Sequence, residues 1–184
     1  MNEIEKNLLK EVAELDALPV GAYNIRSDRK SIARNTSANI DIITKEDKQG
    51  IDIRIKDGTK RESVHIPVII SQSGLKESVY NDFFIGDDCE VTIIAGCGIH
   101  NCGAGDSQHD GIHTFFVGKN SKVRYVEKHY GEGTGAGKRI MNPKTVVHLE
   151  EGAEMNLETA QIGGVDDTIR ETMADLKKGA TLII

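Results

Sequence analysis

Potential metal ligands are concentrated in one short segment of the chain, residues 96–113. This segment holds two of the three cysteines, three of the six histidines, two aspartates and five of the 19 glycines. Its candidate ligands are Cys97, His100, Cys102, His109 and His113. Thiolate and imidazole are the ligands that soft and borderline metals prefer, and glycine allows backbone conformations that let several side chains converge. We therefore predict that this segment is a loop that holds a metal ion or an iron–sulfur cluster.

The spacing of the cysteines leaves a second interpretation open. Cys97 and Cys102 are separated by four residues with His100 between them, which is not a standard zinc-finger pattern. The alternative is a glycine-rich connecting loop whose thiols only pack. The third cysteine, Cys89, takes a position that serine or alanine fills in the repeats described below. We expect it to be a small structural residue.

A second glycine-rich segment, residues 131–139, does not fit a phosphate-binding loop. Glu132 and Arg139 stand where that pattern needs a glycine and a serine or threonine. We expect a flexible loop there and no nucleotide bound by this chain. The sequence also contains nothing that resembles a nucleophile elbow, so it does not predict an enzyme.

Similar units recur from residue 80 onward. Short stretches of alternating character begin at Cys89, Ser121, Ala153 and Ala180, which are 32, 32 and 27 positions apart. A polar, glycine-bearing turn precedes each stretch. A period near 30 in short β segments predicts a β-solenoid, whose coils stack about 4.8 Å apart around an aliphatic interior. A β-sandwich with coincidental spacing is the alternative.

The composition also favours a mainly β fold. The 184 residues include 22 Ile, 12 Val and 11 Thr, but only four Phe, four Tyr and no Trp. Branching at Cβ suits a pleated surface better than a helix.

The net charge of −6 argues against a protein that binds nucleic acid or an anionic membrane unaided. An acidic N-terminus, no long apolar stretch and an odd number of cysteines predict a cytoplasmic protein.

The N-terminal part is predicted to differ from the repeats. Apolar residues at steps of three and four predict an amphipathic helix over residues 2–18, which Pro19 and Gly21 end. Alternating stretches at 40–43 and 51–55, with a turn between them, predict a β-hairpin. We expect three parts: an N-terminal helix at 1–20, a β/α segment at 21–62, and a β-helix core at 63–184 that is truncated at its C-terminal end.

Three short motifs accompany the repeats: Val64-His65-Ile66-Pro67, the Gly96-Cys97 pair and Ile112-His113. Together with the repeated β units, over roughly residues 20–184, they resemble the SufB/SufD family of iron–sulfur cluster assembly scaffolds. The resemblance implies a right-handed parallel β-helix that works in the SUF system with an ABC-type ATPase and a cysteine desulfurase system. It also implies pairing with a second β-helix scaffold subunit, as a homodimer or heterodimer. Cys97 takes the place of a cysteine in the B-type members, and His113 that of a family histidine.

The resulting functional prediction is a scaffold subunit for iron–sulfur cluster assembly whose partner supplies the ATPase activity. Cys97 and Cys102 are predicted as thiolate ligands or persulfide acceptors, with His100, His109 or His113 as auxiliary ligands. The alternative is a bracing, dimerising subunit of the D type that binds no cluster. A polysaccharide-acting β-helix enzyme is disfavoured because such a site would need clustered aromatic residues.

Family members continue into a C-terminal helical region that docks the ATPase. We expect that docking region to be absent from this chain. The last residues, up to Ile184, are apolar and lack a polar cap. We expect this end of the solenoid to continue into further coils or to be buried in a dimer.

Overall fold

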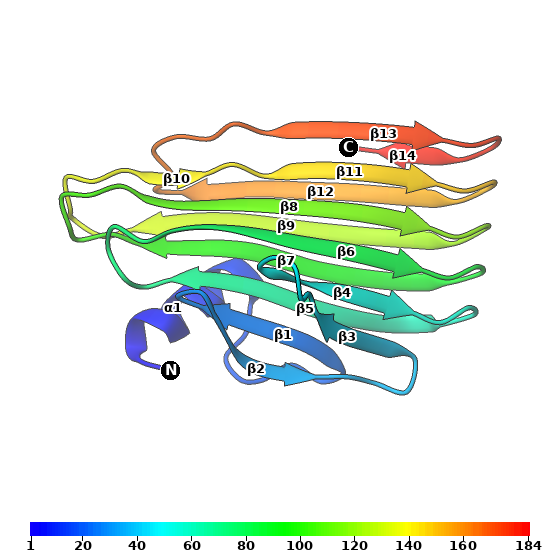
Figure 1. Cartoon of the computed structure of the whole chain (residues 1–184), viewed down its shortest axis with the longest axis horizontal. Helices are drawn as coiled ribbons and strands as arrows, with labels where there is room; N and C mark the ends of the chain where they lie inside the picture. Colours follow the sequence, from blue (N-terminus) through cyan, green and yellow to red (C-terminus); the bar gives the residue numbers. More distant parts are fainter.

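The computed structural model describes residues 1–184, which form one helix and fourteen strands (Figure 1). The N-terminal elements are α1 (Glu3–Ala13), β1 (Ala22–Ser27), β2 (Lys30–Asn35), β3 (Ile40–Thr44) and β4 (Gly50–Ile55). The long strands that follow are β5 (Lys60–Ile70), β6 (Lys76–Ile85), β7 (Glu90–His100), β8 (Ser107–Val117) and β9 (Lys122–Glu132). The chain ends with β10 (Arg139–Met141), β11 (Lys144–Leu149), β12 (Glu154–Gly163), β13 (Glu171–Leu176) and β14 (Thr181–Ile183).

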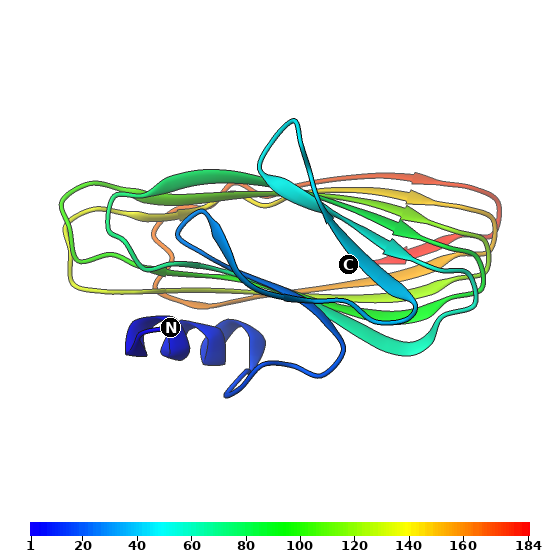
Figure 2. The same cartoon turned by 60° about the horizontal axis from the view of Figure 1, so that its bottom comes forward.

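The strands form two seven-stranded sheets that lie as two layers (Figures 1 and 2). Sheet A has the order β14-β12-β9-β7-β5-β1-β2, and sheet B the order β13-β11-β8-β6-β4-β3 with β10 beside β8. From β5 onward the chain alternates between the sheets, and neighbouring strands within each sheet are parallel. This arrangement is a β-solenoid and confirms the predicted fold class.

The predicted repeats correspond to consecutive strands of sheet A. Glu90 in β7 lies opposite Lys122 in β9, which lies opposite Glu154 in β12, which in turn lies opposite Thr181 in β14. The turns before β7 and β9 contain Asp88 and Asn120 at φ 53° and 56°. The period of about 30 residues is therefore one coil of the solenoid.

The predicted hairpin is also confirmed. Strands β3 and β4 are antiparallel neighbours, with Ile40 opposite Ile55. Residues 21–62, predicted as a β/α segment, contain strands and no helix. Strands β1 and β4 of this segment already pair in parallel with β5 and β6, so the segment forms one end of the solenoid.

The interior of the solenoid changes character along the strands. One end is an aliphatic core that includes Ile53, Ile93 and Val147, closed by the rings of Phe83 and Phe115. A smaller apolar cluster at the other end includes Ile70, Ile99 and Met141. The side chains between these two regions are polar, as described below.

Helix α1 is shorter than the predicted helix over residues 2–18. It begins after a capping box made by Asn2 and Glu5 and ends because Glu14 adopts a left-handed conformation with φ 57°. Leu8 and Leu9 are buried against Ile25 and other residues of sheet A. The apolar spacing thus predicted the buried face of the helix, but not the backbone reversal that ends it.

Two glycines of β7 allow α1 to lie against sheet A. A Cβ atom added at Gly96 would lie 2.7 Å from the carbonyl oxygen of Val12, and one at Gly98 would lie 2.9 Å from Cβ of Leu8. Because successive residues of a strand point to opposite faces, Cys97 between them points into the solenoid.

The prediction that residues 96–113 form a loop is wrong. Residues 96–100 and 107–113 are strand, and only 101–106 form a loop. The structure contains no helix that could cross a bilayer.

Candidate functional site

The structure divides the five predicted ligands into two groups. Cys97, His109 and His113 point into the polar section of the interior and are 2%, 6% and 7% exposed. His100 is at the end of β7, and Cys102 is in the following loop with an exposed thiol. These two residues lie together outside the interior group.

The stacking of coils adds further ligand-type side chains to the interior group. Residues that are partners in neighbouring parallel strands lie one above the other, so each inward position forms a column. Three columns contain such pairs: Cys97 with His129, Glu77 with His109, and Asn81 with His113. Glu127, two residues before His129, also points inward and is 4% exposed. Thiol, imidazole and carboxylate groups therefore share the middle of the solenoid.

One hydrogen-bonded chain fixes part of this group. The hydroxyl of Tyr125 donates to Oε1 of Glu127 at 2.9 Å, and Arg170 donates to Oε2 of the same carboxylate at 2.9 Å. The Tyr125 oxygen also lies 2.7 Å from Nδ1 of His113. Since the single hydroxyl proton of Tyr125 goes to Glu127, we assign the proton of His113 to Nδ1. Nε2 of His113 then accepts from the Asn81 amide at 3.3 Å, so both of its ring nitrogens are engaged.

A second chain of contacts runs from the interior toward the N-terminal end. Arg26 lies 3.1 Å from Oε2 of Glu77, whose side chain is completely buried. Oε1 of Glu77 is 3.5 Å from Nδ1 of His109, which is too long for a good hydrogen bond. The Arg26 charge compensates the buried carboxylate, while Nδ1 of His109 has no hydrogen-bond partner.

Four buried polar atoms near Cys97 have no hydrogen-bond partner. They are Glu77 Oε1, Asn81 Oδ1, His109 Nδ1 and His129 Nδ1, and the whole chain contains only one other such atom. Buried polar groups are nearly always paired, so this concentration needs an explanation. A cavity of about 10 Å³ lies beside Cys97, His109 and His129, which is room for about one small atom or water. No three His, Cys, Asp or Glu side chains converge as a ready-made metal site.

Burial dominates the electrostatics of the interior group. Burial raises the pKa of the Cys97 thiol well above its usual value, and the carboxylates of Glu77 and Glu127 raise it further. Burial lowers the pKa of His113 to about 4. The pKa of Glu127 is lowered, because its contacts with His129 and the charge of Arg170 outweigh the effect of burial. A bound cation would change this balance, because metal coordination favours the thiolate.

The outer group has the arrangement of an activated nucleophile. Sγ of Cys102 is 3.1 Å from Nε2 of His100, and Nδ1 of His100 is 3.1 Å from Oε1 of Glu132. The backbone N–H of Cys102 donates to Ser73 Oγ at 2.8 Å, which holds the loop in place. A thiol beside a base that a third group orients is typical of nucleophilic cysteines.

We expect Cys102 to react with iodoacetamide in the folded protein, while Cys89 and Cys97 stay unmodified because they are buried. His100→Gln should slow alkylation of Cys102 about 10-fold, because the base is lost. Mass spectrometry of timed samples measures both effects. His148→Gln, a histidine elsewhere on the surface of sheet B, is the matched control. Equal rates for His100→Gln and wild type would rule out activation by His100.

Sequence reasoning missed Glu77, Glu127 and His129. The signal that could have found two of them is the 32-residue period. Adding 32 to Cys97 gives His129, and subtracting 32 from His109 gives Glu77. Glu127 follows from His129 by the alternation of a strand.

The chain is similar to one curated protein of known family. It is 34% identical, over 110 residues and 58% of this chain, to an "Iron-sulfur cluster assembly SufBD family protein" from Archaeoglobus fulgidus. The chain resembles the SufB/SufD family. This similarity confirms the resemblance drawn from the short motifs. The matched segment spans 27% of the length of that relative. No family model matches the chain, and no solved structure matches it.

Proposed function

We propose that the chain is part of a scaffold for iron–sulfur cluster assembly and that iron is bound in the polar section of the solenoid. The observation that carries this proposal is the set of unpaired buried ligand atoms around Cys97. The name of the Archaeoglobus relative supports the same role. Thiolate, imidazole and carboxylate ligands suit iron among the metals available to proteins.

In this proposal Cys97, His109 and His129 supply the ligands. The unpaired Nδ1 atoms of His109 and His129 are free to bind, whereas His113 already uses both nitrogens and positions Asn81. Glu77 adds a negative charge that favours a cation at this place. The cavity is small, so it suits one iron ion as cargo better than a preformed cluster, and binding requires these side chains to close around the ion.

Anaerobic reconstitution with ferrous iron and sulfide tests this function. Wild type is expected to retain iron after desalting, and Cys97→Ser is expected to lose most of it, as is His129→Gln. Cys89→Ser is the matched control, because Cys89 is also buried but lies in the aliphatic core. Cys102→Ser separates the two predicted cysteines, and we expect it to retain iron. If Cys97→Ser binds as much iron as wild type, the interior site is not the binding site.

The bracing role of a D-type subunit is the second candidate function. This role is favoured because no three His, Cys, Asp or Glu side chains already converge to hold a metal ion. This role predicts that wild type itself retains no iron in the same experiment. Iron retention by wild type therefore decides between the two functions.

The proposed partners are an ABC-type ATPase, a cysteine desulfurase system and a second β-helix subunit. The ATPase activity would belong to the partner, since no phosphate-binding loop supports nucleotide binding by this chain. We also propose a cytoplasmic location. Three free cysteines support it, because thiols stay reduced in that compartment.

A further inference from the structure

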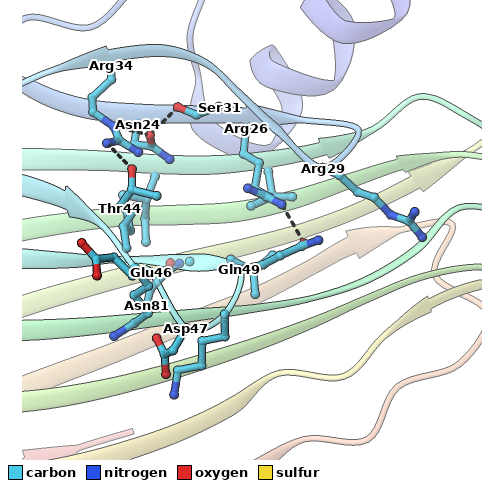
Figure 3. Close-up of a pocket in the computed structure, with 17 residues that line it drawn as sticks. Asn24, Arg26, Arg29, Ser31, Arg34, Thr44, Glu46, Asp47, Gln49 and Asn81 are labelled. Carbon is cyan, nitrogen blue, oxygen red and sulfur yellow. Dashed lines mark hydrogen bonds between the residues drawn. The ribbon is translucent and has the colours of Figure 1, made fainter.

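A cavity of about 520 Å³ lies between the β1–β2 hairpin and the β3–β4 loop, at the N-terminal end of the solenoid (Figure 3). Most of the residues that line it are polar. Its volume lies within the range of small-molecule sites. None of the proposed iron ligands Cys97, His109 and His129 lines it, and Asn81 is the one residue that it shares with the group of unpaired buried atoms.

Two guanidinium groups at the rim are held in place by neutral acceptors. Arg34 donates to Asn24 Oδ1 at 2.9 Å and to Thr44 Oγ1 at 2.8 Å. Arg29 donates to the carbonyl oxygen of Lys76 at 2.7 Å. Each guanidinium has five N–H donors, so both keep donors for a ligand. Because no carboxylate takes part in these contacts, their positive charges remain uncompensated.

The whole lining is positively charged in a chain of net charge −6. The charged side chains are Arg26, Arg29, Arg34, Lys45 and Lys48 against Glu46 and Asp47. Lys45 is neutralised by ion pairs with Asp52 and Asp82, and Arg26 by Glu77. The charged side chains that remain are Arg29, Arg34 and Lys48 against Glu46 and Asp47, which leaves a net positive charge of one. It favours an anion, and in particular one with the planar or tetrahedral oxygens that guanidinium groups bind well.

The floor of the cavity offers a buried acceptor. Asn81 is 3% exposed, and its Oδ1 has no hydrogen-bond donor. Asn81 lines the cavity, and Figure 3 draws it lower in the view than Thr44 and Arg34. Ile66 and Val68 line both this cavity and the small cavity beside Cys97. The floor of the larger cavity is therefore adjacent to the interior site.

We propose that this cavity binds a small molecule that carries carboxylate or phosphate groups. Arg29 and Arg34, which lie at opposite ends of the cavity in Figure 3, bind separate anionic groups of this molecule, and Asn81 Oδ1 accepts a hydrogen bond from a hydroxyl or other donor of the same molecule. The bound anion lies next to the interior site and opposite Arg26, which compensates Glu77. Binding of the anion does not depend on the proposed iron–sulfur function.

Calorimetric titration of the full chain at constant ionic strength tests the proposal, with inorganic phosphate and citrate as separate probes. We expect saturable binding of at least one probe with a stoichiometry near one, and the probe that binds identifies phosphate or carboxylate as the preferred group. The double variant Arg29→Gln/Arg34→Gln is expected to weaken binding about 10- to 100-fold, because charge-assisted hydrogen bonds are lost. Arg34→Lys keeps the positive charge but loses the planar guanidinium group with its paired N–H donors. We expect this variant to bind the probe with intermediate affinity.

Arg124→Gln is the matched control, because Arg124 is an exposed arginine that pairs with Glu158 away from the cavity. It should bind like wild type. Failure of both probes to bind, or equal affinity of wild type and the double variant, would overturn the proposal. Circular dichroism melting of each variant checks that it is folded. Cys97→Ser should keep anion binding even if it loses iron, so failure of this inference and failure of the proposed function give different results.

Discussion

Replacing Phe83 with alanine is expected to lower the free energy of unfolding by about 3–5 kcal/mol. Phe83 is completely buried and stacks on Phe115 with ring centroids 4.4 Å apart. Its edge also packs against the ring of His113, with centroids 5.8 Å apart. Removing the ring leaves a cavity where the aliphatic core meets the polar section. Urea unfolding followed by circular dichroism measures the change.

Phe84→Ala is the matched control for this variant. Phe84 is the next residue of β6 and points to the outer face, where it stacks on Phe116 with centroids 5.2 Å apart. It is only partly buried, so its replacement should cost about 1 kcal/mol. Similar losses for the two variants would contradict the assignment of Phe83 to the interior and Phe84 to the outer face.

The second large effect is a loss of stability between pH 6.5 and pH 4. Burial lowers the pKa of His113 to about 4, whereas an unfolded histidine has a pKa of about 6.5. Between these values the unfolded state binds more protons than the folded state, so stability falls as the pH falls. The shift corresponds to about 3 kcal/mol over the full window. Unfolding by urea at pH 7 and pH 4.5 should show most of this difference.

His113→Asn should remove this part of the pH dependence, because asparagine does not titrate. His148→Asn is the control, since His148 stacks on Phe116 at the outer face of sheet B. Below about pH 4.5 further stability is lost in all variants, because the lowered pKa values of Glu77 and Glu127 mean that these carboxylates are protonated more readily in the unfolded state. A His113→Asn variant with the pH dependence of wild type would show that another group is responsible.

The fold could be predicted because a solenoid repeats one local pattern. Each coil needs an alternating strand and a turn that tolerates left-handed residues such as Asp88 and Asn120, and these leave a period that is visible in the sequence. The end of α1 could not be predicted in the same way. Leu15 and Leu18 continue the apolar spacing, but the chain reverses at Glu14 and takes them out of the helix.

The candidate site was predicted only in part. The prediction rested on the local density of cysteine and histidine, whereas the site depends on which residues pair between neighbouring coils. The density of cysteine and histidine in residues 96–113 drew attention to Cys97 and His109, which the structure places in the interior group. It also suggested a loop, because glycine is common in loops. In the structure Gly96 and Gly98 are strand residues whose missing side chains make room for α1. Glu77 and His129 lie far from this segment in sequence, and only the stacking of coils brings them beside it.

The position of α1 has a consequence for how atoms could reach Cys97. The helix covers the outer face of β7 at Gly96 and Gly98, which leaves no side chains there to move aside and open a gap. Sheet A is therefore covered by α1 and closed to solvent at this point. An iron ion that binds at Cys97, as proposed above, therefore does not enter through this part of sheet A.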